Sequence, residues 1–226
     1  MKVITREGVS YMTIRRLPQY MPLLRAALDA GDHCVSSTKI SDFFGLDPVL
    51  VRKDLASIGI TGQARLGFPV RELIGGIERF LGWDNLSEAF VIGAGNLGRA
   101  LAGYGGFGQH GLKIVALFDT DPEKVGKVIA GKRVTDMTKF ASLVERLRVP
   151  IAILTVPPEA AQDAADAAIA AGIKAIWNFT PTKLTLPDAI IVEQVDLAAS
   201  LAVLSSRLVS ATRTPRQYEE QPVNDM

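Results

Sequence analysis

The chain has 226 residues, of which 48% are hydrophobic and 22% are charged, and its formal net charge is +1. This composition excludes a disordered or fibrous chain and supplies apolar side chains for one large domain or two modest ones. The balanced charge excludes a general attraction of the whole molecule to nucleic acid or anionic lipid, so any basic site has to be local.

The supply of metal and disulfide ligands is low. Cys34 is the single cysteine, and His33 and His110 are the two histidines. An intramolecular disulfide is therefore excluded, and we expect no metal site and a reducing, cytoplasmic setting. No run reaches the about 18 uncharged apolar residues of a membrane helix, and the first residues do not form a signal peptide, so we expect no membrane partner.

The first predicted element is an amphipathic helix over residues 11–30. Pro18 and Pro22 interrupt it, and they either kink the helix or delay its start to about Leu17. Two short helices follow, over about 38–44 and 48–58. A helix, a short glycine-containing turn and a second helix are typical of a helix-turn-helix.

Local capping signals support both short helices. Ser36 or Ser37 caps the first, and Gly45 ends it. Asp47-Pro48 supplies a cap residue followed by proline at the first position of the next helix.

The helix over 48–58 divides into two faces. Val51, Leu55 and Ile58 recur at inward-facing spacings. The opposite face carries no acid, because Asp54 falls off it, and consists of Val49, Arg52, Lys53 and Ala56. Arg and Lys can hydrogen-bond guanine edges in a major groove, and small apolar side chains can lie against thymine methyl groups. This face therefore predicts contact with DNA bases.

A glycine-rich stretch over 59–69 has the character of a hairpin, which would form a wing that places Arg65 in an adjacent minor groove. The basic side chains expected to meet phosphates or bases are Arg15, Arg16, Lys39, Arg52, Lys53 and Arg65. Many domains that never bind DNA also have helix pairs with a basic outer face, so both interpretations stay open here. The apolar stripe over 70–81 predicts a core or inter-domain helix.

The pattern changes near residues 82–87, and from there short apolar runs alternate with helical stretches, as in βαβ units with a parallel sheet. About five strands are expected, at 90–92, 114–118, 151–156, 175–179 and 190–195.

A G-x-G-x-x-G motif follows the first of these strands and opens a helix. Gly93 allows the tight turn, Gly95 lets a pyrophosphate approach the backbone, and Gly98 permits close helix packing. The residues between them, Ala94, Asn96 and Leu97, supply backbone amides to phosphates at the helix N-terminus. Because a strand precedes the motif and a helix follows it, the motif predicts a dinucleotide site.

Asp119 ends the second strand, 21 residues beyond Gly98. A carboxylate here can accept hydrogen bonds from both adenine-ribose hydroxyls and repels a 2′-phosphate, which favours NAD(H) over NADP(H). The alternative is a plain strand-end cap. Residues at the ends of two later strands, Thr155, Val156 and Pro157 together with Asn178 and Phe179, should lie at the same sheet edge, although loop chemistry alone also explains them.

No group stands out as a catalyst. A hydride-transfer enzyme needs a proton donor or acceptor near the nicotinamide, and neither histidine is well placed. Tyr104 and Lys183 remain conceivable, but no substrate domain follows the sheet, so we expect no enzyme.

The last predicted helix is capped by Asp196, and its leucines recur at spacings of 4, 3 and 4 as Leu197, Leu201, Leu204 and Leu208. It could pack on its own sheet. It could also cross to a second subunit, and a two-fold dimer would present two reading helices to a palindromic site.

The combination of motifs resembles the Rex family of redox-sensing transcriptional repressors over nearly the whole chain. In the first region the resemblance rests on residues 16–20, 35–37, 45–48, 51–55 and 62–70. In the second it rests on residues 91–101, 118–119, 151–157, 178–181 and 195–198.

The resemblance implies an α/β protein with four parts: a winged helix-turn-helix DNA-binding domain over 1–84, a Rossmann NAD(H)-binding domain over 85–196, a domain-swapped dimerisation helix over 197–212 and a polar tail over 213–226. It implies a homodimer that binds palindromic double-stranded operator DNA and releases it when NADH replaces NAD+. Ser37 joins the DNA-contacting residues through the same resemblance.

For the coupling we take as a hypothesis a polar link between Arg16, Tyr104 and Asp196, supported by the leucines of the last helix. Two alternatives remain open at this point: a small NAD-dependent oxidoreductase, and a sensor of coenzyme A or another nucleotide, because residues 178–181 also resemble coenzyme A-binding folds.

Overall fold

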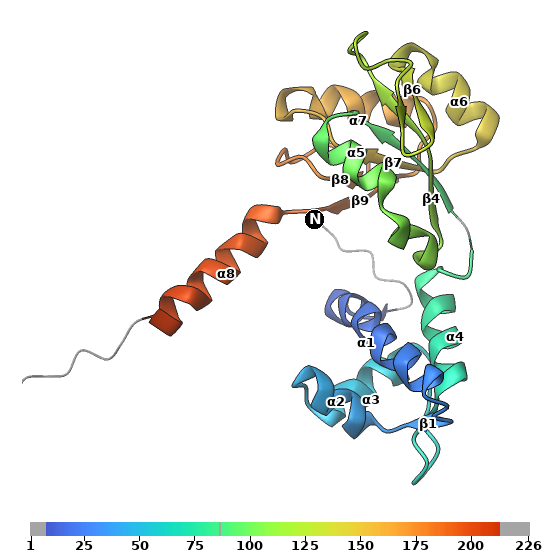
Figure 1. Cartoon of the computed structure of the whole chain (residues 1–226), viewed down its shortest axis with the longest axis vertical. Helices are drawn as coiled ribbons and strands as arrows, with labels where there is room; N and C mark the ends of the chain where they lie inside the picture. Colours follow the sequence, from blue (N-terminus) through green and yellow to red (C-terminus); the bar gives the residue numbers. More distant parts are fainter. Residues whose placement is uncertain (1–7, 86, 213–226) are drawn as a thin grey trace, which may run out of the picture. The chain divides into compact units, whose positions relative to one another are not determined.

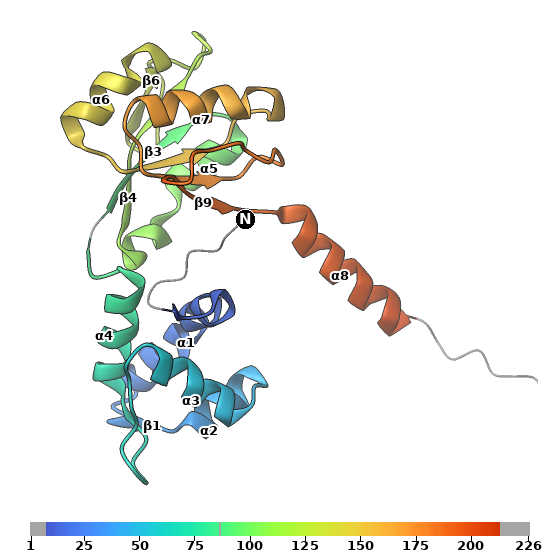
Figure 2. The same ribbon diagram turned by 180° about the vertical axis from the view of Figure 1, so that it is seen from behind.

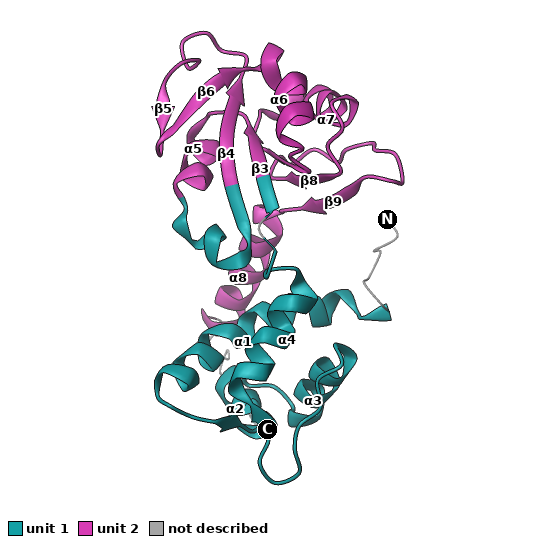
Figure 3. Cartoon of the chain, turned by 90° about the vertical axis from the view of Figure 1, so that its right-hand side faces the viewer, with its two compact units in different colours: residues 1–88, 104–113 teal, residues 89–103, 114–226 magenta. Residues whose placement is uncertain are grey.

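The computed structural model describes residues 8–85 and 87–212, and the chain divides into two compact units (Figure 3). One unit comprises residues 1–88 and 104–113, and the other comprises 89–103 and 114–226. The predicted tail over 213–226 lies outside the described residues. The predicted boundaries at 84/85 and 196/197 stay predictions.

The first unit begins with helix α1 (Tyr11–Asp29), which contains both Pro18 and Pro22. The Ser10 side chain caps it by accepting a hydrogen bond from the Thr13 amide. The predicted late start at Leu17 is therefore wrong. Leu17, Tyr20 and Leu24 are fully buried, and this burial offsets the backbone hydrogen bonds that the prolines cannot make.

Helices α2 (Ser37–Phe44) and α3 (Pro48–Ser57) form the predicted helix-turn-helix. Ser36 caps α2 through the Lys39 amide, Gly45 ends it in the left-handed conformation, and Asp47 caps α3 through the Val49 amide. Helix α4 (Val70–Leu81) closes the unit. The shared core consists of buried side chains from α1, α2, α3, α4 and the small sheet: Leu17, Tyr20, Met21, Leu24, Ala27, Val35, Ile40, Val51, Leu55, Phe68, Val70, Leu73 and Ile77.

The predicted hairpin over 59–69 does not form two paired strands of its own. Strands β1 (Cys34–Val35) and β2 (Phe68–Pro69) pair antiparallel, which joins the start of α2 to the end of the wing. The tip closes through an isolated bridge between Gln63 and Gly67, with Arg65 in the left-handed region at φ 66°. A side chain at Gly67 would collide with the Val35 carbonyl oxygen, so this close approach requires glycine.

The second unit is built on a seven-stranded sheet in the order β5-β6-β4-β3-β7-β8-β9. Its strands are β3 (Ser87–Ile92), β4 (Leu112–Asp119), β5 (Val128–Ile129), β6 (Lys132–Asp136), β7 (Ile151–Leu154), β8 (Ala175–Asn178) and β9 (Ile191–Gln194). The pairs β3–β7, β4–β6, β7–β8 and β8–β9 are parallel, whereas β5 pairs antiparallel with β6. Without β5, the chain order across the sheet is 3-2-1-4-5-6, the Rossmann order, whose direction reverses between β3 and β7. The five predicted strands are confirmed.

The sequence prediction missed β5 and β6. Their segment is polar, and Val128 is 66% exposed, so it lacks the continuous apolar run of a strand buried on both faces.

Helices cover both faces of this sheet (Figures 1 and 2). Helix α5 (Asn96–Gly103) lies on one side, and α6 (Phe140–Leu147) and α7 (Ala161–Ala170) lie on the other. Phe90 and Phe118 from the sheet pack edge-on against Phe140 of α6, with ring centroids 4.9 to 5.8 Å apart. Short 3-10 helices at Gly105–His110, Met137–Lys139 and Pro158–Ala160 form part of the connections.

The last helix, α8 (Leu197–Thr212), is exposed along its whole length. Leu197, Leu201, Leu204 and Leu208 are between 61% and 64% exposed. The alternative in which this helix packs on its own sheet is therefore wrong for the single chain. Among the described helices, none is both long and apolar enough to cross a membrane.

Candidate nucleic-acid and dinucleotide sites

The outer face of α3 has the side chains that its sequence predicts. Val51 and Leu55 are fully buried, while Arg52, Lys53, Ala56 and Val49 are exposed. A depression of about 560 Å³ lies beside this face, and its lining joins α3 and the start of α2 to the wing: Ser36, Ser37, Arg52, Ala56 and residues 60–68. Arg52 Nη1 donates to Ser37 Oγ at 3.1 Å, which holds the guanidinium at the rim of this depression.

The other predicted basic residues differ in exposure and in whether they form ion pairs within the chain. Arg65 is exposed at the wing tip, and Arg15 is exposed on α1 with its guanidinium 5.8 Å from the Tyr11 ring centre. Lys39 forms an exposed ion pair with Asp32 at 2.7 Å, a pair of the kind that contributes little to stability and opens easily. Arg16 does not join this surface, because its side chain is only 16% exposed and contacts Asp54.

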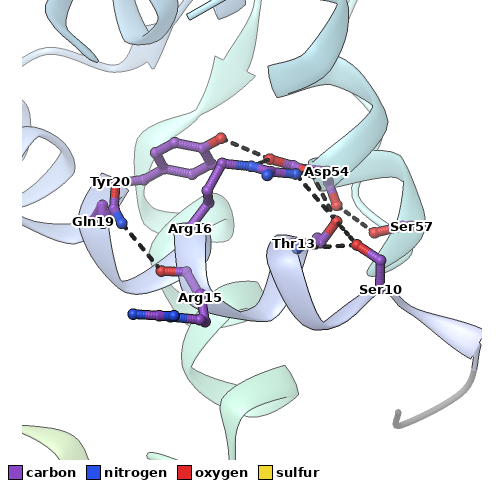
Figure 4. A network of polar contacts seen from close by, with 8 residues as sticks. All are labelled: Ser10, Thr13, Arg15, Arg16, Gln19, Tyr20, Asp54 and Ser57. Carbon is purple, nitrogen blue, oxygen red and sulfur yellow. Dashed lines mark hydrogen bonds and ion pairs between the residues drawn. The ribbon is translucent and has the colours of Figure 1, made fainter. Parts of the chain in front are cut away.

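Asp54 is the centre of a polar network between α1 and α3 (Figure 4). Its carboxylate is 2% exposed and accepts hydrogen bonds from Thr13 Oγ1 at 2.9 Å and from the Tyr20 hydroxyl at 2.8 Å. Arg16 donates from Nε at 2.7 Å and from Nη2 at 2.6 Å. The sequence predicts only that Asp54 leaves the basic face of α3. An acid on the core side of an amphipathic helix is the signal that its carboxylate needs buried hydrogen-bond donors.

The protonation states within this network follow from its hydrogen bonds. Burial alone would raise the pKa of the Asp54 carboxyl, but the hydrogen bonds from Arg16, Tyr20 and Thr13 outweigh it and hold that pKa below its ordinary value. Burial and the hydrogen bond to Asp54 raise the pKa of Tyr20, so its hydroxyl remains a donor. The predicted part of Arg16 in coupling stays a prediction, and it requires the pair with Asp54 to open.

The glycines of the G-x-G-x-x-G turn have different roles. Gly93 has φ +102°, and a Cβ there would lie 2.7 Å from the Thr155 carbonyl oxygen. A Cβ at Gly98 would collide with the Gly93 carbonyl oxygen. At Gly95, by contrast, a Cβ would meet no atom of the chain within 4 Å. The chain itself therefore requires glycine at 93 and 98, whereas the open side of Gly95 fits the approach of a ligand phosphate to the N-terminus of α5.

Thr155 stabilises the glycine turn after β3 by hydrogen bonds, at the point where the strand order reverses. Its Oγ1 donates to the Gly93 carbonyl oxygen at 2.8 Å, and its amide donates to the Ile92 carbonyl oxygen at 2.9 Å. Val156 is half-buried against the core and Pro157 is exposed. The carboxyl ends of β3 and β7 are thus held together at the crevice where open α/β sheets bind ligands.

Asp119 lies beside the same turn and is 9% exposed. Its carboxylate accepts hydrogen bonds from the amides of Ala94 at 2.8 Å and Asp121 at 2.9 Å, and it pairs with Lys124 at 3.2 Å. Strand-end capping is therefore part of what this acid does, and the ribose contact stays a prediction. Burial would raise the pKa of Asp119, but the amides of Asp121 and Ala94 and the Lys124 ammonium outweigh it and lower that pKa. The sequence patterns do not predict this contact of Lys124.

We expect the free energy of unfolding to fall in acid. The folded-state pKa values of Asp54 and Asp119 lie below the ordinary value of 3.8, so both carboxylates stabilise the fold at pH values above it. That contribution is lost as the pH falls through the folded-state values, because the unfolded chain then binds more protons. Urea unfolding measured from pH 7 to pH 2 tests this, and Asp119→Asn should flatten the acid limb. An identical acid limb in this variant would contradict the assignment.

Asn178 is fully buried, and its side-chain amide is hydrogen-bonded to other residues of the chain. Its Oδ1 accepts hydrogen bonds from the Thr180 amide at 3.0 Å and from Thr180 Oγ1 at 2.8 Å, while its Nδ2 donates to Gln194 Oε1 at 2.7 Å. Asn178 therefore shapes the loop after β8, and its contact with a cofactor stays a prediction. Phe179 is half-buried beside Trp177, with ring centres 5.0 Å apart.

The remaining predicted coupling residues each have a partner nearby. Tyr104 is 58% exposed and packs edge-on against Phe107 at 4.9 Å. The Asp196 carboxylate accepts a hydrogen bond from the Ala199 amide at 2.9 Å, which is the predicted cap of α8. Within residues 8–85 and 87–212, no group of three or more His, Cys, Asp or Glu side chains is arranged to hold a metal ion.

Comparison with known proteins identifies relatives of both units. The family model described as "CoA binding domain" matches residues 84–182, and the one described as "Putative DNA-binding protein N-terminus" matches residues 8–56. The redox-sensing transcriptional repressor Rex of Treponema denticola is 48% identical over 192 residues, covering 85% of this chain and 91% of that protein.

Two similar solved structures contain ligands. RSP in complex with β-NAD+ and operator DNA has a TM-score of 0.85 and 37% identity, covering 91% of this chain and 95% of that chain. RSP in complex with β-NADH has a TM-score of 0.82 and 36% identity, covering 91% of this chain and 97% of that chain.

The fold and the two sites define a transcriptional regulator in which a winged helix-turn-helix precedes a Rossmann-like domain. The relatives are named as repressors, so the alternative of a small oxidoreductase is set aside. The chain belongs to the Rex family of redox-sensing transcriptional repressors.

Proposed function

We propose that this chain binds a palindromic operator as a homodimer and releases it when NADH replaces NAD+ in the second unit. The observation that carries the proposal is the open side of Gly95, in a chain that also presents the acid-free basic face of α3. A dinucleotide pyrophosphate fits the first feature, and a major groove fits the second. The cytoplasm, which holds both DNA and the NAD(H) pool, is the compartment in which this protein would work.

Apart from Arg16, each residue predicted to bind DNA or cofactor has a proposed contact with DNA or with the dinucleotide. Arg52, Lys53, Ala56 and Val49 on α3 read base edges, Arg65 enters the minor groove, and Arg15, Ser37 and Lys39 contact phosphates. The Arg16 guanidinium, which the sequence also predicts as a DNA contact, stays paired with Asp54 while the operator is bound. Residues 93–98 hold the pyrophosphate, Asp119 holds the adenine ribose, and residues 155–157 with 178–179 face the nicotinamide.

In this proposal the operator is released because the dimer arrangement that binds DNA and the one that does not differ in their affinity for NADH. Reduced nicotinamide lacks the ring charge of the oxidised form, so an apolar pocket can favour NADH and stabilise one arrangement of the dimer. Changing the distance between the two α3 helices then weakens binding to both half-sites together. In this proposal Tyr104, Asp196 and Arg16 change partners between the two states, with α8 joining the subunits.

The first test is fluorescence anisotropy of the operator duplex of RSP, titrated with this protein at fixed salt, alone and with NAD+ or NADH. Release by NADH but not by NAD+ supports the proposal. Because the coenzyme A-binding family model matches residues 84–182, coenzyme A is included as a competitor. Displacement of NADH by coenzyme A at similar concentration would favour the nucleotide-sensor alternative.

We expect Arg52→Ala to weaken operator binding by roughly 5- to 150-fold, the equivalent of about 1–3 kcal/mol for a good base contact. The matched control is Lys113→Ala, which also removes one positive charge from the first unit but lies at the start of β4, paired with Glu88. Anisotropy titrations with operator and scrambled duplexes measure both. An equal loss on both duplexes would show that Arg52 contacts phosphate rather than bases.

A further inference from the structure

The buried carboxylate of Asp54 lies on the same helix as the predicted base-reading side chains. Arg52, Lys53 and Ala56 are exposed on α3, whereas Asp54 is 2% exposed and faces α1. Its donors, Thr13, Arg16 and Tyr20, all come from α1 and share one face of that helix (Figure 4). Helix α3 packs chiefly against α2, and α1 packs chiefly against α4. The Asp54 network therefore connects α3 to a second helix, α1, which is not its main packing partner.

The Asp54 network adds a directional constraint on α3 to the constraint from its apolar contacts. Val51 and Leu55 are fully buried in the shared core and close packing resists their displacement, but hydrophobic burial itself has no directional preference. The Asp54 carboxylate accepts four hydrogen bonds between 2.6 and 2.9 Å, which weaken steeply when distance or angle changes. A rotation that moves Arg52 and Lys53 relative to a groove must break them.

We propose that Asp54 is a positioning residue for DNA recognition, which sets the rotation of α3 so that sequence discrimination depends on this buried charge. The proposal rests on the operator binding proposed above. Non-specific affinity should not depend on Asp54, because the cations that meet phosphates remain whatever the rotation of α3. Base contacts depend on it, because they require side-chain atoms within hydrogen-bonding distance of particular base edges.

A double variant separates orientation from stability. Removing Asp54 alone leaves the Arg16 guanidinium without its partner, whereas Arg16→Met with Asp54→Leu replaces the ion pair by apolar side chains of similar size and leaves the net charge unchanged. Replacements of this kind are often neutral for folding. The measurements are the thermal unfolding midpoint and the affinities for the RSP operator and a scrambled duplex at one salt concentration.

We expect the double variant to fold with an unfolding midpoint somewhat below that of wild type, because the buried Tyr20 hydroxyl loses its acceptor. We expect it to bind the scrambled duplex within about twofold of wild type and to lose about tenfold or more in operator affinity, the size of one or two mismatched base pairs. An unchanged ratio of operator to scrambled affinity in a folded double variant overturns the proposal. Equal losses on both duplexes also overturn it, because they assign to Arg16 a phosphate contact instead.

Tyr20→Phe gives an independent readout if the double variant does not fold. It removes one hydrogen bond to Asp54 without changing charge, and we expect the operator-to-scrambled ratio to fall about threefold, as for one hydrogen bond. A ratio equal to that of wild type contradicts the inference. Wild-type protein that itself fails to distinguish the duplexes contradicts the proposed operator binding rather than the role of Asp54.

Discussion

Gly95→Ala is expected to fold normally and to lose its response to NADH. A Cβ at this position meets no atom of the chain within 4 Å, so the fold is kept. Alanine is a poorer cap than glycine for the start of α5, and we therefore expect only a modest loss of stability. The same methyl group occupies the space where a pyrophosphate would approach the amides of residues 95–97. Overpacking by one methyl group costs on the order of 1–3 kcal/mol, which weakens NADH binding by roughly 5- to 150-fold.

Two neighbouring glycines provide matched controls. Gly98→Ala should destabilise the unit itself, because its Cβ would collide with the Gly93 carbonyl oxygen. Gly103→Ala, at the end of the same helix, places its Cβ 3.7 Å from the Ala130 methyl group and should change neither folding nor binding. Isothermal titration with NADH and thermal unfolding of the three variants distinguish these outcomes. NADH affinity at the wild-type level in Gly95→Ala would contradict the placement of the pyrophosphate.

The second large effect is expected from α8. Leu201 and Leu208 are each 61% exposed, and no side chain of this helix is buried in the single chain. An exposed apolar stripe of this length is typical of a protein interface. We expect Leu201→Glu combined with Leu208→Glu to leave each unit folded and to produce monomers. Operator affinity should then fall by at least about 100-fold, because the second half-site no longer adds to the first.

Sedimentation of the variant gives its oligomeric state, and anisotropy gives its operator affinity. Ser206→Glu is the control, because it adds one of the two negative charges of the leucine variant on the opposite side of α8 from Leu201 and Leu208. A dimer that survives both leucine substitutions would contradict the dimerisation role of this stripe. Dissociation by Ser206→Glu as well would show that the partner encloses the whole helix rather than one face.

Local signals along the chain predicted most of the fold. Asp47-Pro48 marked the start of α3, Gly45 ended α2, and a period of four residues separated the buried Val51 and Leu55 from the exposed Arg52. The glycine motif between a strand and a helix marked the turn after β3. Each of these signals acts within about one turn of helix or across one strand end, so neighbouring residues are enough to identify it.

Only the tertiary structure shows the contacts between residues that are far apart in the sequence. The donors that surround Asp54 lie about forty positions earlier, and the strand that pairs with β2 lies before α2. Of the three glycines in the turn, the structure shows that only Gly95 lacks a neighbour within 4 Å, and the atoms that crowd Gly93 belong to the distant residues Thr155 and Val156. The sequence by itself determined most of the elements and the chemical character of both sites, because these follow from local hydrogen bonding and periodic burial. Which buried polar groups meet was decided only by packing, since a carboxylate such as Asp54 loses its hydration on folding and is stable only where distant donors replace the lost water.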